Sequence, residues 1–115
     1  MTLDEYQSRA LRTMKEWDNK HDQIVNASLG LAGEMGEVSE WIKHWLLYGA
    51  DRASEKGYTH DAFVKELGDL MWYIAEMCDA FGLSMNEVAE RNLKKLAARH
   101  GDKFSGVGDR TGEGA

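Results

Sequence analysis

The fold is decided by the stretch KELGDLMWYI at residues 65–74. Apart from its opening lysine and the acids Glu66 and Asp69, every residue of this stretch is apolar, aromatic or small. Apolar residues continue on both sides at steps of three and four, which predicts a helix from about residue 59 to residue 81. Because an all-round apolar helix has to be covered on most sides, this helix should be central in the fold.

Three further helices are predicted around it. The first opens the chain and keeps helical spacing as far as Trp17; the second starts between residues 22 and 26 and runs to Tyr48. Gly49 would end the second helix in a left-handed conformation, and a polar loop would follow. The fourth covers residues 84–100. Alternating strand patterns are almost absent. The predicted class is all-α, a subunit resembling a four-helix bundle.

Length and composition point to one small soluble domain. The chain has 115 residues, 43% of them hydrophobic and 30% charged, which predicts a folded domain at residues 1–100 and a glycine-rich mobile tail at residues 101–115. No apolar run is long enough for a membrane span, and the acidic N-terminus lacks a signal core, so we expect a cytoplasmic protein. A net charge of -6 without a basic stripe argues against nucleic-acid binding.

The apolar surface exceeds what one subunit of this size can bury. Besides the central helix, Trp41, Trp45 and Trp72 need cover. Contact between identical subunits is the natural solution, so we expect the core to be completed by homo-oligomerisation.

Two pairs of acids stand out on the predicted helices. Glu34 and Glu37 lie three residues apart, as do Glu66 and Asp69, so each pair leaves its helix from one face. If the two helices pack side by side, four carboxylates converge. At about 5 Å and an effective dielectric constant of about 20, each charged pair repels by roughly 3 kcal/mol. A divalent cation would offset this repulsion best.

The ligand type limits the choice of metal. Oxygen-only sites suit Mg²⁺, Mn²⁺ or Ca²⁺, whereas zinc and copper sites normally use histidine or cysteine. Acid pairs three apart are also common on solvated helix faces, so one pair alone would favour a structural role. Here both pairs lie on apolar helices among small residues, with glycines at positions 30, 33, 36 and 68. Because each mid-helix glycine costs about 1 kcal/mol relative to alanine, close helix approach around a ligand is indicated.

Three segments together resemble the MazG-like nucleotide pyrophosphohydrolases: GLAGEMGE at residues 30–37, ELGDLMWY at residues 66–73 and NLKKLAAR at residues 92–99. The resemblance implies Mg²⁺-dependent hydrolysis of nucleoside triphosphates between the α and β phosphates, with Mn²⁺ as a substitute metal, in dimers or dimers of dimers. Glu34, Glu37, Glu66 and Asp69 would hold the metal.

Within such a reaction, the chemistry of individual residues suggests roles in catalysis and substrate binding. Glu37, or else Glu34, would activate the attacking water. Phosphate and sugar would be bound by Asn92, Lys95 and Arg99, and the base by Gln7 and Tyr73, with Trp17 and Trp72 as further candidates.

Two alternatives stay open at this point. A related enzyme of the same build could instead act on dUTP, dCTP or phosphoribosyl-ATP, because such substrates differ only in pocket contacts. A non-catalytic helical module could use the apolar central helix for assembly, although four clustered acids would then lack a role.

Overall fold

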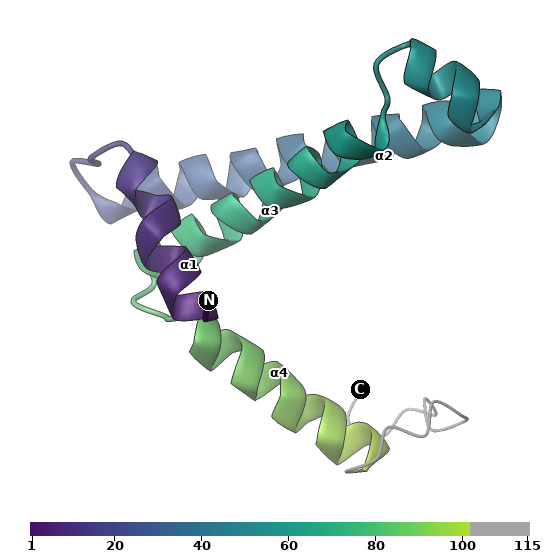
Figure 1. Cartoon of the computed structure of the whole chain (residues 1–115). Coiled ribbons are helices and arrows are strands. Elements are labelled where there is room, and N and C mark those ends of the chain that lie inside the picture. The colour runs from purple at the N-terminus through teal and green to yellow at the C-terminus, as the bar shows by residue number, and fades with distance from the viewer. Residues whose placement is uncertain (102–115) are drawn as a thin grey trace.

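The computed structural model describes residues 1–101, and in this range the protein is built from helices without strands (Figure 1). The predicted all-α class is therefore confirmed. The predicted tail at residues 101–115 lies outside the described residues except for Gly101. The elements in chain order are α1 (Leu3–Ala10), the 3₁₀ turn η1 (Leu11–Thr13), α2 (Lys20–Glu55), α3 (His60–Ala80) and α4 (Met85–His100).

Each of the four α-helices begins after a side chain that accepts a hydrogen bond from a first-turn backbone N–H. A cap of this kind stabilises a helix by about 1 kcal/mol. Thr2 and Ser84 are two of these caps, and Thr2 forms a full capping box with Glu5. Helix α2 begins earlier than predicted, because Asn19 accepts from the backbone N–H of Asp22.

The first helix is shorter than predicted. Helix α1 ends at Ala10, and the η1 turn leads into extended backbone at Met14, with ψ 139°. The hydroxyl of Thr13 donates to the Ala10 carbonyl over 2.8 Å. Trp17 consequently lies in the loop before α2, where its indole N–H bonds to Glu76 of α3. This long-range bond favours the loop over continued helix.

Gly49 breaks α2 at the predicted position, with φ 81° and ψ 166°. The predicted polar loop is wrong, however, since the chain returns to helix and continues to Glu55. Ala53 within this extra segment is fully buried, and its carbonyl accepts a hydrogen bond from the backbone N–H of Tyr58. Burial and this turn hold the segment in place.

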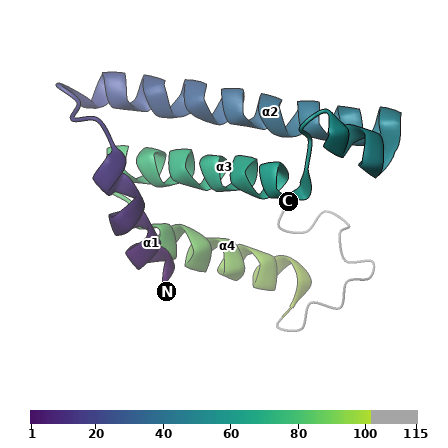
Figure 2. The same ribbon diagram turned by 45° about the horizontal axis from the view of Figure 1, so that its top comes forward.

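Helices α2 and α3 run antiparallel and lie side by side in both views (Figures 1 and 2). Contacts between them pair early positions of α2 with late positions of α3. Near their far end Trp41 packs on Phe63 with ring centroids 4.6 Å apart. The polar and close contacts along the seam are Gln23 with Asp79, Asn26 with Glu76, Gly30 with Tyr73 and Glu34 with Glu66.

Helix α4 starts from a corner shared with α1 and the end of α3. Met85, Ala75 and Cys78 form a small buried cluster there. The side chain of Gln7 ties the corner together, donating to the Leu83 carbonyl over 3.1 Å and accepting from the Met85 backbone N–H over 2.9 Å. Beyond this corner α4 points away from the α2–α3 pair (Figure 1). None of the described helices combines the length and apolar character needed to cross a bilayer.

Candidate metal centre

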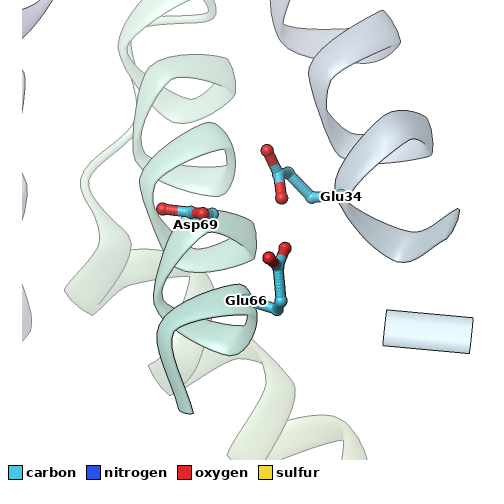
Figure 3. A group of neighbouring side chains, drawn as sticks. All are labelled: Glu34, Glu66 and Asp69. Carbon is cyan, nitrogen blue, oxygen red and sulfur yellow. The ribbon is translucent and has the colours of Figure 1, made fainter. Parts of the chain in front are cut away.

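Three carboxylates meet between α2 and α3. Glu34 comes from α2, and Glu66 and Asp69 come from successive turns of α3. One oxygen from each lies within 4.8 Å of the others. Figure 3 shows Glu34 and Glu66 pointing toward one another in the space between the helices. The predicted convergence of acids from two helices is therefore present for three of the four.

The electrostatics of this group are those of uncompensated negative charge. Burial, a hydrogen bond with Glu66 and the nearby charges of Asp69, Glu66 and Glu37 raise the pKa of Glu34 to about 7. No lysine, arginine or histidine of the described chain forms an ion pair with Glu34, Glu66 or Asp69. Glu34 therefore keeps its proton to higher pH than a free glutamate, because carboxylates this close together do not readily carry negative charge at the same time.

The donor set fits a hard divalent cation. Oxygen Oε2 of Glu66 is buried and has no hydrogen-bond partner among the described residues. Leaving a buried carboxylate oxygen unpaired is costly, so a ligand at this point would be stabilising. All donors are carboxylate oxygens, the type that Mg²⁺ and Mn²⁺ prefer. Glu34, Glu66 and Asp69 would hold such an ion.

Glu37 lies outside the close group of three. Its side chain is exposed on α2, although its charge contributes to the raised pKa of Glu34. Glu37 is therefore positioned at the rim, and its metal-binding role stays a prediction.

Close helix approach explains one of the four helical glycines. A Cβ at Gly30 would overlap the ring of Tyr73, so only glycine lets α3 come this near. At Gly33, Gly36 and Gly68 a Cβ would meet no atom within 4 Å in the described structure. Tyr73 is half-buried against α2, one turn beyond Asp69; its contact with a base stays a prediction.

The predicted phosphate-binding residues lie on α4, away from the carboxylates. Asn92 and Lys95 are exposed and Arg99 is half-buried. Because α4 diverges from α3 after the corner (Figure 1), one subunit as described does not bring them onto the acidic group. Gln7 was predicted to contact the base. Its side-chain amide forms hydrogen bonds with backbone groups of Leu83 and Met85 at the corner between α1, α3 and α4.

Sequence reasoning missed a second polar group beside the first. Glu76 has no exposed surface; its two oxygens accept from the Trp17 indole over 3.1 Å and the Asn26 amide over 2.9 Å. Next to it, Gln23 donates to Asp79 over 2.8 Å. The spacing in the sequence could have placed Glu76 near the acidic group, since it follows Asp69 by two helical turns and lies on the same face of the helix. Its two hydrogen-bond partners could not be predicted from the sequence.

Comparison with known proteins agrees with this geometry. The MazG nucleotide pyrophosphohydrolase domain matches residues 24–104, which is more than two thirds of the chain and includes all three clustered acids. The chain is also similar to the Gene 37 protein of Mycobacterium phage L5, with 33% identity over 72 residues. This similarity covers 63% of the chain and 61% of the phage protein, so the chain spans less than two thirds of this relative. No solved structure matches significantly. The chain belongs to the MazG nucleotide pyrophosphohydrolase domain family.

Proposed function

We propose that the protein hydrolyses nucleoside or deoxynucleoside triphosphates between the α and β phosphates, releasing a monophosphate and pyrophosphate, with Mg²⁺ as cofactor. The observation that carries this proposal is the meeting of Glu34, Glu66 and Asp69 within 4.8 Å. Family membership supplies the reaction class, and the all-oxygen donor set supports the choice of metal.

Each part of the site has a task in this reaction. When bound, Mg²⁺ would supply the positive charge that phosphate oxygens need in order to approach an acidic site and that the departing pyrophosphate needs in order to leave. Glu37, exposed at the rim, would accept a proton from the attacking water or orient it; Glu34 is the alternative. Lys95, Arg99 and Asn92 would bind phosphate and sugar oxygens.

We also propose that the chain assembles as a homodimer or dimer of dimers. Leu67, Met71 and Ile74 follow one another at steps of four and three along α3, and each is about 40% exposed (41%, 40% and 41%). Exposed apolar residues in such a stripe favour a protein partner. A second copy is the natural occupant, because two identical stripes cover each other around a two-fold axis. In such an assembly, the α4 residues of one subunit would be able to reach the carboxylates of another.

The test is pyrophosphate release from a panel of nucleoside and deoxynucleoside triphosphates, with Mg²⁺ and with EDTA. Glu66→Gln should abolish release, while Glu90→Gln, an exposed acid on α4, should leave it unchanged as a matched control. Mg²⁺-dependent release by the wild type that needs Glu66 supports the proposal. Absence of release from every nucleotide would favour the non-catalytic module instead.

A further inference from the structure

An open surface pocket of about 490 Å³, called the cavity below, lies where the loop after η1 meets the first turn of α2 and the last turn of α3. Trp17, Gln23 and Asp79 belong to its lining. Apart from Trp17 and Met14 its lining is polar or charged, so a ligand there would be recognised mainly by hydrogen bonds, with one aromatic ring to stack on. Its volume is ample for a nucleobase with its sugar.

Trp17, the aromatic residue that lines the cavity, is held in place by a hydrogen bond to a buried carboxylate. Fully buried Glu76 accepts a hydrogen bond from the Trp17 indole N–H over 3.1 Å, and its other oxygen is fixed by Asn26 over 2.9 Å. The ammonium of Lys15 lies 4.6 Å from the Trp17 ring centroid. A ring fixed by a buried carboxylate offers a base a stacking surface without first having to be ordered.

The cavity also holds one oriented carboxylate. Gln23 is only 3% exposed, and its amide nitrogen donates to Oδ2 of Asp79 over 2.8 Å. The second oxygen of Asp79, Oδ1, accepts no hydrogen bond from the described residues. The other acids of the lining, Glu16 and Asp18, are exposed and have no hydrogen-bond partner in the described part of the chain. Asp79 is therefore the acid with a fixed direction.

The cavity and the metal centre lie along the same pair of helices, α2 and α3. Asp79 follows Asp69 by ten residues of α3, about 15 Å along the helix axis. On the opposite helix, Gln23 precedes Glu34 by eleven residues, a similar distance in the same direction. This separation is comparable with the length of an extended nucleoside triphosphate. A nucleotide with its phosphates at the carboxylates is therefore long enough to reach the cavity with its base.

We infer that this cavity is the base subsite and that Asp79 selects bases carrying an exocyclic amine, namely cytosine, adenine and guanine, over uracil and thymine. The inference rests on the proposed hydrolysis and adds its substrate class. An amine N–H donates to the open Oδ1 of Asp79, whereas O4 of uracil or thymine turns an acceptor toward the carboxylate. One matched contact of this kind changes selectivity about 10- to 100-fold.

The decisive experiment compares kcat/KM for dCTP and dUTP, which share sugar and phosphates and differ in the base near position 4. The wild type should prefer dCTP about 10- to 100-fold. Asp79→Asn keeps an oxygen for Gln23 and presents an amide donor, so the preference should disappear or reverse. Glu90→Gln removes an equal charge from the exposed surface of α4, outside the cavity, and should change the ratio by less than about twofold.

Equal use of dCTP and dUTP by the wild type, or an unchanged preference in a folded Asp79→Asn variant, would overturn the inference while leaving the proposed hydrolysis intact. If no triphosphate is hydrolysed, binding of dCMP and dUMP tests the cavity alone. Quenching of tryptophan fluorescence should then occur at lower dCMP than dUMP concentration and should be lost in Trp17→Phe. Equal binding, or binding by neither, refutes the base subsite.

Discussion

Replacing Glu66 with glutamine should stabilise the metal-free protein and remove its response to Mg²⁺. At 4.8 Å and an effective dielectric constant of about 20, each pair of carboxylates repels by roughly 3 kcal/mol. The variant loses two such repulsions, with Glu34 and with Asp69. Water reaches the site from the exposed side of Asp69 and screens part of this, so we expect a gain of about 1–3 kcal/mol in unfolding free energy at pH 8 in EDTA.

The pH dependence of the wild type follows from the same charges. The folded protein raises the pKa of Glu34 from 4.5 to about 7, so the native state holds a proton that the unfolded state has released. Stability should therefore fall as pH rises from about 4.5 to 7, and not rise as it does for an ion-paired acid. Because the site is partly open to water, about 1–2 kcal/mol is expected. The gain in Glu66→Gln should accordingly be smaller at pH 5 than at pH 8.

Thermal and urea unfolding followed by circular dichroism measure these effects. Mg²⁺ at about 100 times its dissociation constant should add about 2.7 kcal/mol to the wild type and nothing to Glu66→Gln. Glu90→Gln, which removes an exposed acid of α4, should behave as the wild type in both respects. The electrostatic reasoning is refuted if Glu66→Gln is less stable than the wild type in EDTA, or if both gain equally from Mg²⁺.

Other predictions concern packing and assembly. Gly30→Ala should cost about 1–3 kcal/mol, because the new methyl group overlaps the Tyr73 ring, whereas Gly33→Ala, where a Cβ meets nothing within 4 Å, should gain up to about 1 kcal/mol; urea midpoints distinguish them, and equal effects would contradict the close approach. Glu76→Ala should cost about 2–4 kcal/mol, since the half-buried Trp17 and Asn26 donors lose their fully buried acceptor; a neutral effect in urea unfolding would mean that water replaces the carboxylate. Met71→Glu should convert the assembly to monomers in sedimentation velocity, and an unchanged sedimentation coefficient would exclude this stripe from the interface.

Local signals predicted the four helices, though not all of their ends, and the spacing within the acidic pairs. Steps of three and four in apolar positions predicted α3 within one residue at each end. The i, i+3 spacing predicted which acids share a face, and the two helices do bring Glu34 to Glu66. These features depend on neighbours within one turn, which the sequence shows directly.

Features that depend on distant partners were not predictable. Trp17 has helical spacing with the first helix, yet it leaves the helix to donate a hydrogen bond to Glu76, 59 residues away. Glu76 by itself resembles any acid on a solvated face, and only the folded structure shows that it is fully buried. The direction of α4 is set by the corner around Gln7 and Met85, and periodicity within a helix carries no information on direction.

A crystal structure with Mn²⁺ and an anomalous difference map tests the central claim most directly. The account predicts one strong peak between α2 and α3, with oxygens of Glu34, Glu66 and Asp69 about 2.0–2.3 Å away. The same crystals of Glu66→Gln should lack that peak. A wild-type structure without manganese at this place, with the three carboxylates turned apart toward water, would contradict the account.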